Sequence, residues 1–137
     1  MLFRSKKAAK HSEQVSDSLM KNLNVTEVPL DELWTFVQKK EKNLSAWERL
    51  HTEYGDTWVW IGFDPVYKLV LAHVEGEREE AEAEALLQKV QSRLAVGLIQ
   101  LFTSDRLVHY ATALLKVFGR QVQPARRGTR GRFPRPR

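Results

Sequence analysis

Two aspartates are the side chains best suited to do chemistry in this sequence, one near the start of a predicted strand's apolar stretch and one directly after another predicted strand. Asp31 lies in the segment VPLDELWTFV, and Asp105 directly follows the apolar run GLIQLFTS. If those two strands are neighbours, both carboxylates converge on one end of the sheet, where open α/β sheets usually hold their active sites. Carboxylate oxygens suit Mg²⁺ or Mn²⁺, and such ions activate a nucleophile in phosphodiester chemistry.

Spacing alone also supports a simpler role for Asp105. It stands just before a predicted helix, where aspartate commonly caps the first turn. Glu32 directly follows Asp31, and because successive strand residues alternate, it points to the opposite face of the sheet. Glu32 is therefore the weaker ligand candidate. The sequence has no Gly-rich phosphate loop, no G-x-S-x-G and no H-E-x-x-H. From the residues alone, a helix cap is favoured over a metal site.

The elements that must position these aspartates follow the order β-β-β-α-β-α. Patterning predicts strands at residues 25–38, 57–63, 68–74 and 97–104, and helices at 77–96 and 107–118. Short helices are also expected near residues 15–23 and 44–50. Three strands would pair as an antiparallel meander. The helix at 77–96 would then cross over to a fourth strand parallel to the first, by the right-handed crossover rule. The sequence therefore predicts an α/β fold.

Large apolar side chains define the predicted core. Trp58, Trp60 and Phe63 are big enough to anchor it, and Trp34 is expected to pack there beside the site. The run at 97–104 is almost continuously apolar, which is typical of a strand buried on both faces.

Four blocks of sequence resemble transposases of the insertion-sequence-one family. They are VPLDELWTFVQKK, WVWIGFD, LAHVEGER and FTSDRLVHYATALLKVFGR, and the similarity spans about residues 11–130. The resemblance implies a DDE-type enzyme with an RNase H-like fold that cleaves and joins DNA strands. It implies that Asp31 and Asp105 are the first two catalytic aspartates and that both bind Mg²⁺ or Mn²⁺. His73 matches a family histidine, although a lone strand histidine is most often structural.

The chain departs from the family pattern in three places. The family's third carboxylate is a glutamate in a downstream stretch like I-E-R-x-N, and this chain ends at Arg137 without one. Arg106 stands where glycine is frequent, and no N-terminal zinc finger or helix-turn-helix is evident. The resemblance therefore implies an incomplete RNase H-like core in a transposase truncated at the C-terminus. We expect weak metal binding and no activity unless a second chain or a longer frameshifted product supplies the missing segment.

Charge divides the chain into a near-neutral body and a basic tail. Seven of the 22 basic residues lie in the tail, which leaves 15 basic against 17 acidic residues elsewhere. We therefore divide the chain into a polar segment (1–24), a partial catalytic core (25–119) and an arginine-rich, disordered tail (120–137). The arginines expected to contact DNA phosphates are Arg120, Arg126, Arg127, Arg130, Arg132, Arg135 and Arg137.

Two non-enzymatic hypotheses remain open beside the transposase. In one, the protein binds nucleic acid through its arginine tail; in the other, it is an interaction domain with a solvated tail. The absence of cysteine excludes disulfides, thiolate metal sites and cysteine nucleophiles. No apolar run is long enough to span a membrane, and the N-terminus lacks the apolar core of a signal peptide. We expect a cytoplasmic protein that joins the nucleoid when bound to DNA.

Overall fold

The chain folds into one mixed sheet with helices packed around it. The computed structural model describes all residues except 1, 99, 106, 126–127, 129–134 and 136–137. The elements in chain order are α1 (Leu2–Leu19), β1 (Glu27–Val37), the 3₁₀ turn η1 (Glu41–Asn43), α2 (Ala46–His51), β2 (Gly55–Asp64), β3 (Leu69–Gly76), α3 (Glu80–Arg93), β4 (Leu101–Thr103) and α4 (Val108–Val117).

The sheet has the predicted topology. Its strand order is β3-β2-β1-β4, with β1 antiparallel to β2, β2 antiparallel to β3, and β1 parallel to β4. Helix α3 makes the crossover from β3 to β4, as a parallel pair requires. The sequence prediction of a three-stranded meander plus a parallel fourth strand is confirmed.

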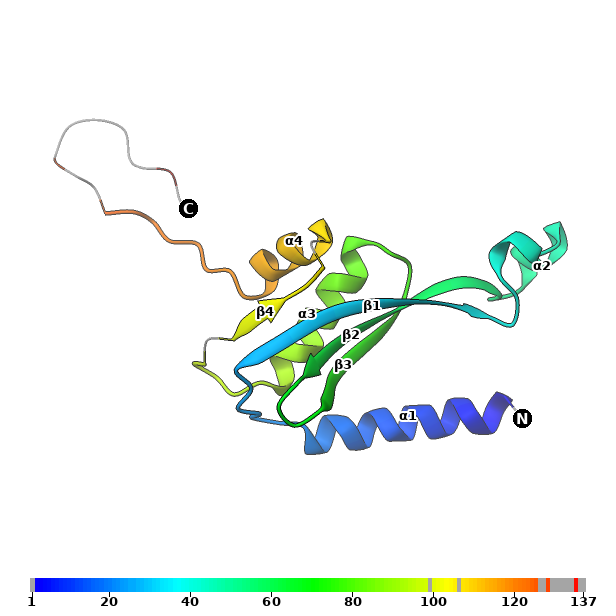
Figure 1. The fold of residues 1–137 in the computed structure, drawn as a ribbon, viewed down its shortest axis with the longest axis horizontal. Coiled ribbons are helices and arrows are strands. Elements are labelled where there is room, and N and C mark those ends of the chain that lie inside the picture. The colour runs from blue at the N-terminus through cyan, green and yellow to red at the C-terminus, as the bar shows by residue number, and fades with distance from the viewer. Residues whose placement is uncertain (1, 99, 106, 126–127, 129–134, 136–137) are drawn as a thin grey trace.

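Helices α3 and α4 cover one face of the sheet (Figure 1). The core beneath them combines β1, β2 and both helices, with Val28, Trp60, Leu86 and Val90 fully buried. Gly62 allows the close approach, because a Cβ there would lie only 2.9 Å from Val90 Cγ2. The apolar side chains on one side of α3 therefore face the sheet.

Strands β1 and β2 continue past the helices as a projecting two-stranded ribbon (Figure 1). Their pairing runs on to Val37 opposite Gly55, although burial along β1 stops at Glu32. Helix α2 closes the tip. It starts in a capping box, in which Ser45 and Glu48 each accept a hydrogen bond from the other's backbone N–H.

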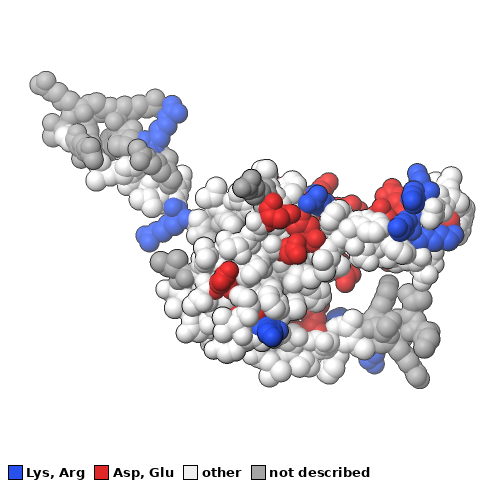
Figure 2. Space-filling view, in the orientation of Figure 1, with Lys and Arg blue, Asp and Glu red and all other residues white. Residues whose placement is uncertain are grey.

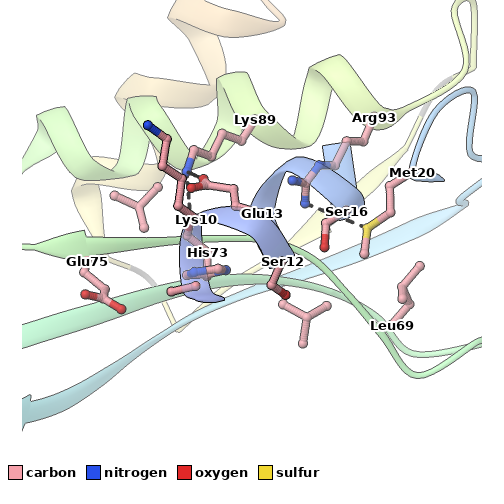
Figure 3. A pocket seen from close by; sticks show the side chains of 13 residues that line it. Lys10, Ser12, Glu13, Ser16, Met20, Leu69, His73, Glu75, Lys89 and Arg93 are labelled. Carbon is pink, nitrogen blue, oxygen red and sulfur yellow. Dashed lines mark hydrogen bonds and ion pairs between the residues drawn. The ribbon is translucent and has the colours of Figure 1, made fainter. Parts of the chain in front are cut away.

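Helix α1 is longer than the short helix that the sequence predicts, and it docks through ion pairs. Its apolar residues Val15 and Leu19 are 40% and 75% exposed. Glu13 instead accepts a hydrogen bond from Lys89 at 2.8 Å, and Asp17 one from Arg93 at 2.5 Å. Helix α1 thus lies beside β3 and α3 (Figure 3).

Two predictions about individual elements are wrong. The segment 97–104 was expected to be a strand buried on both faces, yet β4 has only three residues and Leu101 is 61% exposed. The reason is position, since β4 is an edge strand that pairs only with β1. The helix expected from residue 77 begins at Glu80, which leaves Glu77 and Arg78 in the preceding loop.

Candidate functional site

The parallel pairing of β1 with β4 aims the two predicted aspartates at the same end of the sheet. The last paired residues are Pro29 and Thr103. Asp31 lies two positions beyond Pro29, and Asp105 lies two positions beyond Thr103, so both aspartates follow the same rung of the ladder. Asp31 lies within β1, where it is still paired with Ile61 of β2, and Asp105 lies just past the end of β4.

Both aspartates are exposed and lightly tethered by their own backbone. Asp31 Oδ1 accepts a hydrogen bond from the Glu32 N–H at 2.9 Å, and Asp105 Oδ1 accepts one from the Leu107 N–H at 3.3 Å. Asp105 is not the cap of α4, because the N-cap residue is Leu107 and it receives no side-chain cap. The cap interpretation of Asp105 is therefore wrong, and each carboxylate keeps oxygen lone pairs for an outside group.

Glu32 is committed to internal partners. Its side chain is 2% exposed, and Oε1 accepts hydrogen bonds from Arg78 Nη2 at 2.5 Å and Nε at 3.2 Å. The Tyr110 hydroxyl donates to Oε2 at 3.1 Å. Asp31 and Glu32 thus point to opposite faces as expected, and Glu32 is held as an internal anchor rather than as a ligand.

The charges of the two aspartates shift the pKa values of the groups around Glu32. Burial raises the pKa of Tyr110, and the nearby negative charges of Glu32, Asp31 and Asp105 raise it further. Hydrogen bonding to Glu32 raises the pKa of Arg78, and the charge of Asp105 acts in the same direction. All five groups therefore share one electrostatic neighbourhood. Figure 2 shows acidic atoms gathered where β1 passes α3 and α4.

Two tryptophans of β2 fix the position of Arg78. The Arg78 guanidinium carbon lies 4.7 Å from the ring centroid of Trp58. Trp60 Nε1 donates to the Glu77 carbonyl at 3.0 Å, which anchors the chain immediately before Arg78. Trp60 also packs edge-on against Tyr110 at 5.4 Å between ring centroids. This frame holds the guanidinium between a buried acid and an aromatic ring.

The carboxylate oxygens of Asp31 and Asp105 are suitable ligands for a hydrated divalent ion. Mg²⁺ binds through one or two carboxylates and keeps several waters, which matches a pair of exposed aspartates. Within the described part of the chain, no three acidic or histidine side chains gather around a point that could hold a metal. None of the residues outside that part is acidic, so the two aspartates would bind an ion weakly.

No family model matches the chain, and neither does any curated protein or solved structure.

Sequence reasoning misplaced one residue and missed another. Trp34 was expected in the core beside the site, yet it is 43% exposed because β1 has left the helices at that point. Arg78 falls inside the helix predicted over residues 77–96, although it lies in the loop before α3 and pairs with Glu32. The alternation along β1 could have predicted this ion pair. Glu32 lies on the same strand face as Val28 and Leu30, and a carboxylate on a buried face needs a cation.

The tail is only partly covered by the structure. Arg120 and Arg135 are exposed and belong to no helix or strand. Arg126, Arg127, Arg130, Arg132 and Arg137 lie outside the described residues, as does Arg106. Their expected contact with DNA stays a prediction.

A cavity at the other edge of the sheet is separate from the aspartates. It is an open hollow with a volume of about 730 Å³, lined by residues of α1, β3 and α3 (Figure 3). His73 lines it from β3, the strand farthest from β4. Lys89 and Glu13, which form an ion pair, also line it.

Among the described residues, no helix is long and apolar enough to span a membrane.

Proposed function

We propose that this chain carries part of the active site of a DNA transposase of the DDE type, built on an RNase H-like arrangement. Asp31 and Asp105 would hold Mg²⁺ or Mn²⁺, and the partner would be DNA. The observation that carries this proposal is the register of the parallel β1–β4 ladder, in which Asp31 and Asp105 each follow the last paired residues, Pro29 and Thr103, by two positions. The order of elements and the resemblance of four sequence blocks support the same function.

The roles of the protein's own residues follow from the geometry. Asp31 and Asp105 offer exposed carboxylates, and Glu32, Arg78 and Tyr110 form the rigid support behind them. A bound divalent ion supplies Lewis-acid stabilisation of a phosphodiester oxygen. Two carboxylates are only part of the ligand set for such chemistry, in which a misplacement near 1 Å costs about a hundredfold. We expect no strand cleavage by this chain alone.

Metal binding gives the direct test. Mn²⁺ titration followed by electron paramagnetic resonance should show one weak site in the wild type, and Asp31→Asn or Asp105→Asn should each abolish it. Asp56→Asn is the matched control, because it removes one carboxylate at the far end of the ribbon, opposite Phe36. Equal Mn²⁺ binding in all four proteins would exclude the metal site.

A cleavage assay tests the expectation of inactivity separately. The purified chain is incubated with supercoiled plasmid and Mn²⁺ beside the Asp105→Asn variant. We expect no nicking by either protein. Nicking by the wild type that disappears in Asp105→Asn would show that the two aspartates suffice for cleavage.

A further inference from the structure

One face of the projecting ribbon carries a row of aromatic rings that starts beside the candidate site. Trp58 on β2 and Trp34 on β1 are directly paired in the antiparallel register. Phe36 follows two residues farther along the same face of β1, with 6.0 Å between its ring centroid and that of Trp34. We call Trp58, Trp34 and Phe36 the aromatic row.

A cation lies against each end of the aromatic row. Arg78 packs over Trp58 at 4.7 Å at the end nearest the aspartates. At the other end, the Lys40 ammonium lies 4.9 Å from the Trp34 centroid and 5.8 Å from that of Phe36. One cation therefore lies over the innermost ring of the row, and a second lies over its two outer rings.

The row is open to a ligand. Trp34 and Phe36 are 43% and 42% exposed, which is unusual for two large aromatic side chains so close together. The Arg78 side chain is 43% exposed although it is paired with Glu32. Only two of the five guanidinium N–H donors are used on Glu32, and among the described residues no further partner takes the others.

We propose that the aromatic row binds single-stranded DNA, with bases stacking on Trp34 and Phe36 and with Arg78 and Lys40 contacting the phosphates on either side. Stacking on aromatic rings combined with cations along the backbone is how proteins hold single strands without sequence preference. Charge favours this occupant, because Arg78 lies over Trp58 and Lys40 lies over Trp34 and Phe36, which gives the row two cations for a phosphate backbone. The inference rests on the proposed function, to which it adds the path of the DNA strand past Asp105.

Opposite faces of the same strand provide a matched comparison. Leu33 and Val37 are 52% and 43% exposed on the face away from the row, so their truncation removes comparably exposed apolar side chains from the other face of β1. The test variants are Trp34→Ala/Phe36→Ala and Leu33→Ala/Val37→Ala in the full chain, with Lys40→Glu as a third.

Circular dichroism confirms that each variant is folded. Binding of a fluorescein-labelled single-stranded oligonucleotide is followed by anisotropy in 200 mM salt, which weakens contacts made by the arginine tail.

The proposal predicts that Trp34→Ala/Phe36→Ala weakens binding by about 30-fold or more, while Leu33→Ala/Val37→Ala changes it less than threefold. Lys40→Glu should weaken it by a smaller factor. Equal losses in both double variants, or no loss in either, would overturn the proposal. It would also be overturned if Trp34→Ala/Phe36→Ala left DNA binding intact but abolished self-association in sedimentation experiments, because the occupant would then be a second copy.

The Mn²⁺ titration keeps this inference distinct from the proposed function. Loss of DNA binding in Trp34→Ala/Phe36→Ala with no Mn²⁺ site in the wild type would support the aromatic row and exclude the metal-dependent active site. A Mn²⁺ site with unchanged DNA binding in that variant would exclude the row alone.

Discussion

The two halves of β1 belong to one strand but have opposite surroundings. In the inner half, Val28, Leu30 and Glu32 are buried, and the residues between them are not. In the outer half every residue from Leu33 to Val37 is exposed, although four of those five are apolar or aromatic. The inner half lies under α3 and α4, whereas the outer half has left them (Figure 1). Strand alternation decides which face a side chain occupies, and only a second layer decides whether that face is buried.

Two tryptophans offer the largest test of this contrast. Trp60 is fully buried under the helices, whereas Trp34 is 43% exposed on the ribbon. Trp60→Ala should lower the free energy of unfolding by about 3–5 kcal/mol, since it leaves a cavity and removes the bond to Glu77. Trp34→Ala should cost less than about 1 kcal/mol. Urea unfolding of both variants measures the difference, and similar losses would mean that the ribbon is part of the core.

A smaller effect is expected from the hydrogen bond that ties α4 to the last buried residue of the inner half. Tyr110→Phe removes the donor to Glu32 Oε2 and leaves part of a buried carboxylate unpaired. The free energy of unfolding should fall by about 1–3 kcal/mol. Tyr67→Phe is the control, because Tyr67 is 76% exposed and should change stability very little. If both variants unfold at the same urea concentration, the Tyr110 hydroxyl contributes nothing to stability.

The smallest effect is expected at the tip of the ribbon. Hydrogen bonds from Lys39 and Ser45 lower the pKa of Glu48 to about 2. A lowered carboxyl pKa stabilises the fold above the ordinary value near 4.5 and loses that contribution as the pH falls toward 2. The amide protection factors of α2, which are corrected for the intrinsic pH dependence of exchange, should therefore fall over that range, and Glu48→Gln should make them less dependent on pH. Unchanged pH dependence in Glu48→Gln would assign the effect to another group.

The sequence predicts the strand order well because the signals for it are local. Alternation in WVWIGFD and LAHVEG, the Asp64–Pro65 turn and the stripe on α3 each involve residues close in sequence. The rule for parallel crossovers then places β4 beside β1, and with it Asp105 near Asp31. The predicted positions of the two aspartates depend only on those steps.

What the sequence does not predict depends on contacts between distant segments. The pairing of Glu32 with Arg78 joins residues 46 positions apart, and the bond to Tyr110 joins residues 78 apart. The exposure of Trp34 depends on where α3 and α4 end above the sheet, and the shortness of β4 on its edge position. Composition and periodicity report none of these distances.

The shortness of β4 has a consequence for how the two aspartates respond to a ligand. Asp31 belongs to an 11-residue strand paired on both sides, whereas Asp105 follows a three-residue strand that pairs on one side only. Local opening of β4 therefore displaces Asp105 at little energetic cost and leaves Asp31 in place. Any ligand that needs both carboxylates binds only the closed population, so its measured affinity is the intrinsic affinity reduced by that fraction. Saturating ligand should accordingly slow amide exchange in β4 more than in β1.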